Sequence, residues 1–247
     1  MAWWLKNNIR MIQNNIRDID VRMDIDKQIE WLKSFGANTL QIGCGGITAF
    51  HPTKLDFQWQ NPYMEGDFFG EVLKKCHENG IRVIARFDFS KTHEKFYEEH
   101  PEWYFRGLDG KPVRYHDTVA TCVNGPYQSE RSLDIIREVM EQYPVDGIFF
   151  NMFGYITFDY SGNYVGICQC ENCKRRFREM YGEELPVKEN LEDPVFIKYI
   201  DFKKKTVDEM LTKIHNLARS INPDCAVSTY ATTGVDIVRN ESNSAVD

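Results

Sequence analysis

Residues 133–151, LDIIREVMEQYPVDGIFFN, contain the unit from which the fold is predicted. Apolar residues in the first half recur at helical spacing, so a helix with one buried face is expected there. A break with Pro at residues 143–146 separates this helix from Gly147–Asn151, which is rich in Ile and Phe, as a buried strand is. The stretch therefore predicts a helix that leads through a short turn into a strand.

The same helix, break and strand order occurs four times along the chain. The other three strands predicted in this way are Thr39–Gly43, Ile81–Phe87 and Cys225–Tyr230. A first strand is predicted around Asn15–Ile19, after an N-terminal helix that ends near Gln13. Asp24 or Asp26 would cap the next helix, which ends at Gly36.

Strands that alternate with helices predict a parallel α/β sheet, either doubly wound or closed as a (β/α)8 TIM-type barrel. No glycine-rich phosphate motif follows a strand, and the long strand-to-helix loops would all lie on one rim, so the barrel is preferred. Five predicted strands use the whole chain, whereas a closed barrel needs eight. We therefore expect residues 1–247 to form one barrel domain, cut short after about five βα units.

Composition and charge limit the partners and the compartment. The formal net charge is −7, so no nucleic-acid partner is expected. No apolar stretch is long enough to span a bilayer, and the N-terminus turns polar too soon for a secretory signal. A cytoplasmic protein without membrane contact is expected, and its seven cysteines, an odd number, are expected to form no disulfide.

Three cysteines within six residues, Cys168, Cys170 and Cys173, can reach one tetrahedral metal ion. Cys122 is the candidate fourth ligand because it too lies in a long strand-to-helix loop. Four sulfurs would leave no open position for water, so a zinc ion held there would be structural. The alternatives are reduced thiols without metal, a redox pair, and a zinc ribbon, although a ribbon would need a second C-x2-C knuckle and a basic surface.

Aromatic and polar residues are concentrated in the predicted strand-to-helix loops. Flat rings beside carboxylates, His and Arg suit a carbohydrate substrate, although about half of these rings are expected to pack under the loops. The candidates for binding the sugar are His51, His93 and Tyr155 in the loops and Arg86 and Asn151 near strand ends. A lone loop histidine is, however, more often an ordinary surface residue.

Carboxylates at the carboxyl ends of the predicted strands are the candidate catalytic groups. Glycoside hydrolysis generally uses two carboxyl groups, one as acid and one as nucleophile or base. Asp88 is the first candidate, and Glu241, after the fifth strand, is a weaker one. Asp18 and Asp20, after the first strand, are more readily explained as capping or hydrogen-bonding residues.

Several motifs resemble those of a known family. They are residues 17–24 (RDIDVRMD), 49–53 (AFHPT), 100–103 (HPEW) and 146–150 (DGIFF), and the cysteine cluster followed by 177–182 (FREMYG). Over nearly its whole length the chain resembles the family called hypothetical glycosyl hydrolase 6, whose relatives resemble the β-galactosidases of glycoside hydrolase family 42.

The resemblance to family 42 has consequences for each candidate site. It implies a structural zinc on Cys122 and the three clustered cysteines. It also implies an Asn-Glu pair at the end of strand four, in which the Glu is the acid/base, but here Asn151 is followed by Met152. The family's nucleophile would lie near strand seven, beyond Asp247, and its members commonly form trimers.

Three functions are therefore weighed from the sequence. The first is a β-galactosidase-like glycosidase that uses carboxylates as acid and base. The second is a noncatalytic carbohydrate-binding barrel or pseudoenzyme, which Met152 would explain. The third is a hydrolase or transferase for another polar small molecule, built on Asp88 and a histidine.

Overall fold

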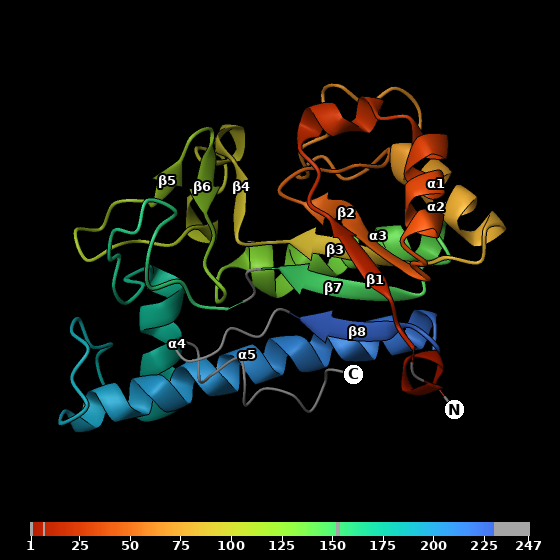
Figure 1. Cartoon of the computed structure of the whole chain (residues 1–247). Helices are drawn as coiled ribbons and strands as arrows, with labels where there is room; N and C mark the ends of the chain where they lie inside the picture. Colours follow the sequence, from red (N-terminus) through yellow and green to blue (C-terminus); the bar gives the residue numbers. More distant parts are fainter. Residues whose placement is uncertain (1, 7, 152–153, 230–247) are drawn as a thin grey trace.

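The computed structural model describes residues 2–6, 8–151 and 154–229. Its centre is a five-stranded parallel sheet with the strand order β1-β2-β3-β7-β8 (Figure 1). The strands are β1 (Met11–Asn14), β2 (Thr39–Gly46), β3 (Arg82–Asp88), β7 (Gly147–Asn151) and β8 (Ala226–Thr229). Within the described residues the sheet is open, with β1 and β8 at its edges.

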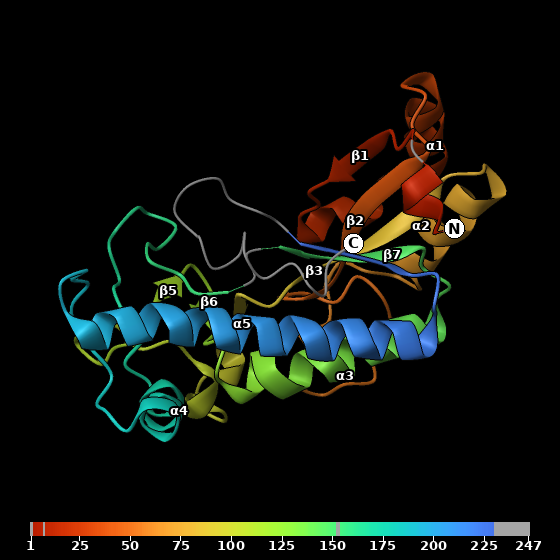
Figure 2. The same ribbon diagram turned by 90° about the horizontal axis from the view of Figure 1, so that it is seen from below.

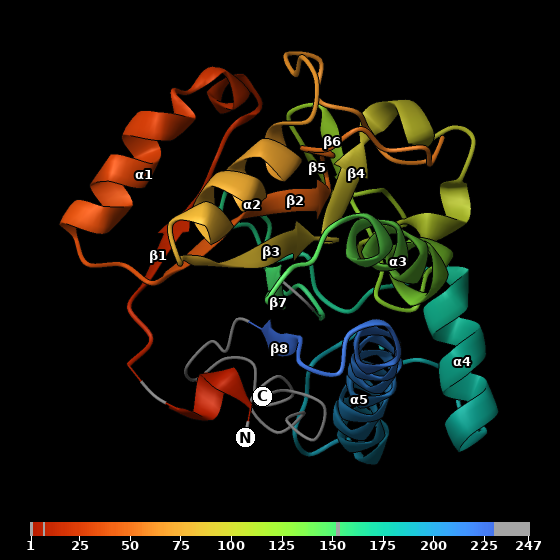
Figure 3. The same ribbon diagram turned by 90° about the vertical axis from the view of Figure 1, so that its right-hand side faces the viewer.

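Helices connect the parallel strands and lie in an arc outside them (Figure 3). The α-helices are α1 (Ile25–Ser34), α2 (Phe68–Glu78), α3 (Ser132–Gln142), α4 (Glu171–Tyr181) and α5 (Pro194–Ile221). Figure 2 shows α3 and α5 side by side, with α4 against the first half of α5. Consecutive parallel strands with outer helices are the arrangement that βα units produce in a barrel.

The long strand-to-helix connections lie at the carboxyl ends of the strands. One of them contains a small antiparallel sheet of the order β4-β6-β5, which lies beyond the ends of β3 and β7 (Figure 1). Its strands are β4 (Lys91–His93), β5 (Arg114–Tyr115) and β6 (Thr118–Ala120). Short 3-10 helices are Trp3–Lys6, Asp18–Arg22, Glu94–Phe96 and Pro101–Trp103, and a π-helical turn at Tyr127–Arg131 leads into α3.

The core lies between the parallel sheet and its helices. All eight residues of β2 are buried, as expected for a parallel strand that is covered on both faces. The stripe on α3 that the sequence predicts is also found, since Ile136, Val139 and Met140 are buried against the sheet. Asp24 caps α1 by accepting a hydrogen bond from the Lys27 amide, and Gly36 follows that helix with a positive φ of 66°.

Four of the five predicted strands are confirmed, with boundaries that shift by a few residues. The N-terminal prediction was wrong, because β1 is Met11–Asn14 and the segment from Asp18 forms a 3-10 helix. The register of β1 is fixed by distant partners: the Asn38 side chain accepts from the Arg10 amide at 2.8 Å, and Gln41 donates to Gln13 at 2.9 Å. Local periodicity does not contain this information.

The parallel α/β fold of the prediction is thus present, with five parallel strands in the order that the first five units of a barrel would have. Among the residues that the structure describes, no helix combines the length and the apolar character needed to cross a membrane.

Candidate active site and four-cysteine cluster

Asp88 ends β3 at the carboxyl edge of the sheet and is nearly buried. Its Oδ1 accepts hydrogen bonds from the amide and the hydroxyl of Ser90, and its Oδ2 accepts one from Asn151 Nδ2 at 2.7 Å. Asn151 ends the neighbouring strand β7, which is paired with β3 at this position. These donors fix the position of the carboxylate group.

The backbone of β2 approaches Asp88 closely. The β2–β3 register shifts between Gly43 and Gly45, so that Gly46 is paired with Asp88. Gly46 has a φ of 103°, and a Cβ at this position would lie 2.2 Å from the Asp88 carbonyl oxygen. Only glycine permits this approach, which helps to hold Asp88 at the mouth of the sheet.

Arg86 lies two residues before Asp88 and therefore on the same face of β3. Its Nη2 is 4.0 Å from Asp88 Oδ2, and its Nε is buried with no hydrogen-bond partner among the described residues. Burial lowers the pKa of the Arg86 guanidinium, and the charge of Asp88 opposes that shift. The guanidinium thus has a donor available for a ligand bound next to Asp88.

Asp88 and Arg86 share a cleft with Asp18, which begins the 3-10 helix after β1. The cleft encloses about 480 Å³, counting the solvent at its mouth, and is also lined by the turn after β2, including Thr48 and Phe50. Burial raises the pKa of Asp18; a hydrogen bond from Thr48 opposes the rise, and the negative charge of Asp117 adds to it. Two carboxyl groups in different environments therefore line one cleft, which is the situation in which acid and base roles separate.

His93 lies near Asp18, close enough for its charge to lower the pKa of that carboxyl group. The imidazole stacks on Trp59, with ring centroids 3.9 Å apart, and its Nε2 is 3.5 Å from Asp117 Oδ2. His93 keeps partial exposure but is not one of the residues that line the cleft.

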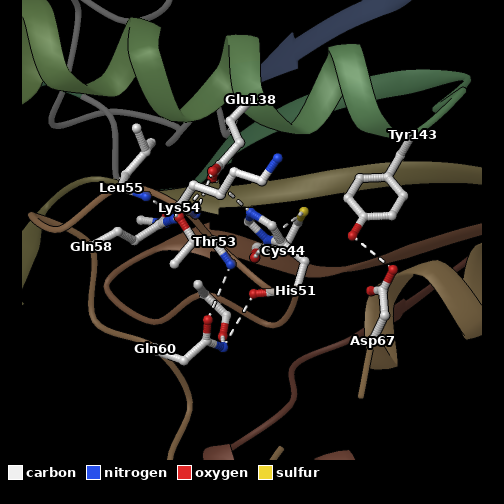
Figure 4. A network of polar contacts seen from close by, with 12 residues as sticks. Cys44, His51, Thr53, Lys54, Leu55, Gln58, Gln60, Asp67, Glu138 and Tyr143 are labelled. Carbon is white, nitrogen blue, oxygen red and sulfur yellow. Dashed lines mark hydrogen bonds and ion pairs between the residues drawn. The ribbon is translucent and has the colours of Figure 1, made fainter.

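His51 has a different position from the one expected of a substrate-binding residue. It is 0% exposed, its Nδ1 lies 3.2 Å from the Cys44 carbonyl oxygen, and its Nε2 lies 3.1 Å from Glu138 Oε2 (Figure 4). The prediction that His51 binds substrate is therefore corrected: both ring nitrogens have protein partners, and no surface is left for a sugar.

Glu138, on α3, anchors the loop that follows β2. Besides His51, its carboxylate accepts hydrogen bonds from the Thr53 hydroxyl at 2.7 Å and the Lys54 amide at 2.6 Å (Figure 4). This loop carries Thr48, which lines the cleft, and Trp59, on which His93 stacks, so the buried network positions both.

The four predicted cysteines meet in one buried cluster. The Cys122 sulfur is 3.3 Å from that of Cys173, 3.5 Å from that of Cys170 and 3.7 Å from that of Cys168. All four sulfurs lie within 4.8 Å of one another. A tetrahedral ion with metal–sulfur bonds of about 2.3 Å needs sulfurs about 3.8 Å apart, so the donor set fits one metal ion.

Hydrogen bonds within this cluster shift the pKa values of its thiols in opposite directions. The hydrogen bond with Cys122 is the largest cause of the lowered pKa of Cys170, whereas the hydrogen bond with Cys168 is the largest cause of the raised pKa of Cys122, and the one with Cys122 of the raised pKa of Cys173. The three other cysteines, Cys44, Cys76 and Cys225, lie apart from it in the core. None of the seven cysteines, all of which the structure describes, forms a disulfide.

Asn124 supports the cluster from outside and was not singled out by the sequence. Its backbone amide donates to the Cys122 sulfur, and its side-chain Nδ2 donates to the Cys173 sulfur at 3.2 Å. The same Nδ2 lies 2.7 Å from the Tyr155 hydroxyl, whose other partner is Thr206 at 2.7 Å. Tyr155 is therefore corrected from a substrate-binding residue to a buried residue beside the cysteines, and burial raises the pKa of its phenol well above the ordinary value.

The remaining predicted carboxylate, Glu241, lies outside the described residues. Of the other candidates, the structure brings Asp88, Arg86 and Asn151 together and places His93 near Asp18. Ser90 was missed, although its spacing from Asp88 is the signal of a local side-chain-to-backbone turn.

Comparison with known families identifies the chain. The model of the family described as hypothetical glycosyl hydrolase 6 matches residues 24–152, which is 129 of the 247 residues and includes both β3 and β7. The chain belongs to the hypothetical glycosyl hydrolase 6 family. No curated protein matches it in sequence.

Solved structures with a similar fold include glycosidases. The α-L-fucosidase isoenzyme 2 from Paenibacillus thiaminolyticus is 19% identical with a TM-score of 0.69, over 91% of this chain and 33% of that one. The β-galactosidase from Rahnella sp. R3 is 18% identical with a TM-score of 0.61, over 85% and 33% of the two chains. The β-amylase catalytic domain from Paenibacillus polymyxa is 11% identical with a TM-score of 0.63, over 88% and 64%.

These identities show a shared fold. The chain spans about a third of the length of the fucosidase and the β-galactosidase. The fold of this hypothetical glycosyl hydrolase 6 member is thus a mixed α/β fold with a parallel sheet, similar to glycoside hydrolases of the TIM-barrel type.

Proposed function

We propose that the protein is a glycoside hydrolase whose substrate binds over the carboxyl edge of the sheet, between Asp18 and Asp88. The observation that carries the proposal is that these two carboxyl groups line one cleft with Arg86. Family membership and the glycosidase fold support the same reaction class. A β-galactoside or an α-L-fucoside is the first substrate to test, since the similar structures carry those names.

In this mechanism Asp18 is the acid and Asp88 the ionised partner. Asp18 gives its proton to the glycosidic oxygen as the bond from that oxygen to the anomeric carbon breaks. Asp88, positioned by Ser90 and Asn151, faces the positive charge that develops at the anomeric carbon. One water molecule supplies the hydroxyl group of the released sugar, and its proton restores the acid. Asp18 would thus replace the acid/base that Met152 does not provide.

We further propose that zinc occupies the four-cysteine cluster. Four buried sulfurs at tetrahedral spacing fit zinc and leave no open coordination position, so the ion would stabilise the fold and take no part in catalysis. It would join the loop that contains Cys122 to the start of α4, where Cys170 and Cys173 lie.

A panel of chromogenic aryl glycosides tests the glycosidase. Wild type is expected to cleave at least one of them, and Asp88→Asn is expected to lower kcat/KM by at least a hundredfold. Asp134→Asn, an exposed carboxylate on α3, is the matched control. Glu241→Gln, included in the same series, tests the other predicted carboxylate, and equal cleavage by wild type and Asp88→Asn would contradict the proposal.

One observation favours a second candidate. Met152 stands where the family resemblance implies an acid/base glutamate, which is the change expected of a noncatalytic carbohydrate-binding protein. That function predicts sugar binding that Arg86→Met weakens, with no turnover of any glycoside.

A further inference from the structure

A second cavity adjoins the cleft and is different in character. It encloses about 490 Å³, counting the solvent at its mouth, and lies between the small antiparallel sheet and the loop after β7. Its lining is mostly apolar and aromatic, with Tyr115 from one side and Phe158 and Tyr160 from the other. Ser90, which hydrogen-bonds Asp88, is also part of its wall, so the cavity begins where the cleft ends.

Lys91 is the unusual residue of this cavity. The residue as a whole is only 8% exposed, and its ammonium group has ring contacts but no hydrogen bond or ion pair among the described residues. The ammonium nitrogen is not one of the buried polar atoms without a partner, so it reaches the solvent of the cavity. Its ammonium nitrogen lies 3.5 Å from the ring centroid of Tyr160 and 5.4 Å from that of Tyr115. Aromatic faces attract a cation, and a ligand anion in the cavity would add the charged partner that these rings do not supply.

The other charged groups of the cavity are already engaged. Arg114 is paired with Glu94, and the Asp159 carboxylate accepts hydrogen bonds from Asn163 and from two backbone amides of its own turn. Lys91 is therefore the cation of this wall that has no anionic partner among the described residues. The Asp159 carboxylate, whose pKa is lowered by the hydrogen bond from Asn163 first, remains an anion in the same wall. The rings of Tyr115 and Tyr160 are half-exposed and stack on each other, with centroids 4.8 Å apart.

We propose that this cavity is a subsite for a negatively charged sugar residue, next to the residue held over Asp88. The sugar ring would lie on the tyrosine faces, and Lys91 would bind its anionic oxygens. This inference rests on the proposed glycosidase function for its placement within a longer substrate, and it adds that the substrate is acidic. Carboxylate and sulfate groups share the required chemistry, and the two are separated by the probes below.

Calorimetric titration of the full-length protein tests the subsite with galactose, galacturonate and galactose 6-sulfate. Wild type is expected to bind at least one of the two anions tenfold or more tightly than galactose, and the preferred anion identifies the source of the charge. Lys91→Met, which keeps the apolar stem, is expected to lose that preference, whereas Lys91→Arg is expected to keep it. Lys111→Met, an exposed lysine of the same region, is the matched control and should bind as wild type does.

Equal binding of the three sugars by wild type would overturn the subsite, and so would a preference that survives in a folded Lys91→Met variant. Asp88→Asn separates this proposal from the proposed function, since it should lose cleavage but keep the preference for the anion. An anion preference in a protein that cleaves no glycoside would leave the subsite standing and refute the glycosidase. Cleavage of a glycoside without an anion preference would support the glycosidase and refute the subsite.

Discussion

Removal of one cysteine from the four-cysteine cluster should destabilise the protein far more than an ordinary core substitution. A metal held by Cys122 and Cys168 closes a loop of 46 positions. The chain-entropy expression for a cross-link gives about 4 kcal/mol for a loop of this length. For a domain of this size, 1 kcal/mol shifts the melting temperature by about 2–4 °C, so Cys122→Ala should lower it by about 8–16 °C.

The assay combines thermal melting, followed by circular dichroism, with measurement of bound metal by mass spectrometry. Wild type should contain one zinc per chain, and a strong chelator should lower its melting temperature towards that of Cys122→Ala. Cys76→Ala is the matched control, because Cys76 is equally buried but lies outside the cluster. It should lose only about 1 kcal/mol, keep its zinc and stay sensitive to the chelator.

Two results would refute this reasoning. One is a wild-type protein, purified without chelators and under reducing conditions, that holds no metal. The other is a Cys122→Ala variant that melts no lower than Cys76→Ala, because the cross-link at Cys122 would then add nothing to the stability of the protein.

Three other substitutions give separate tests. Asn124→Ala removes the donor to the Cys173 sulfur and should weaken zinc binding about tenfold to a hundredfold. The zinc affinity would be measured by competition with a chromogenic chelator, and an unchanged affinity would show that the contact does not support the metal site. Glu138→Ala leaves His51 and the loop after β2 without their buried acceptor, so it should lower the free energy of unfolding in urea by about 3 kcal/mol. The exposed Glu141→Ala on the same helix should lower it by less than about 1 kcal/mol. Equal losses in the two variants would contradict the anchoring role. Burial raises the pKa of Asp18 in the folded state. The stability that protonated Asp18 contributes is therefore present below the pKa of the unfolded state and is lost as pH rises through the pKa of the folded state. Asp18→Asn should therefore gain stability relative to wild type as pH rises from acid to neutral in melting experiments, and a pH-independent difference would argue against a perturbed carboxyl group.

The parallel strands could be predicted from the sequence because each follows a local pattern of helix, break and apolar run. The pattern around Gly147–Asn151 is complete within about twenty residues, and that strand has the predicted boundaries. The first strand could not be predicted in the same way, because Met11–Asn14 is held by pairing with residues 39–42 and by side chains from β2 and the turn before it.

Some site residues could likewise be predicted from local spacing, and others depend on contacts with distant residues. Three clustered cysteines indicate a metal site by spacing alone, and the fourth follows from its position in a loop on the same rim. His51 is paired with Glu138, which lies 87 positions away in the chain. No local pattern can therefore distinguish this buried histidine from a sugar-binding one. Asp18 has a candidate role only because the fold places it across a cleft from Asp88.

The most direct test of the proposed glycosidase compares leaving groups. For a cleaved glycoside, kcat/KM would be measured with dinitrophenol and with phenol as leaving groups, in wild type, Asp18→Asn and Asp88→Asn. A good leaving group needs little protonation, so Asp18→Asn should lose about a hundredfold or more on the phenyl substrate and little on the dinitrophenyl one. Asp88→Asn should lose activity on both. Equal losses of Asp18→Asn on the two substrates, or full activity of Asp88→Asn, would contradict the assignment of these two carboxyl groups.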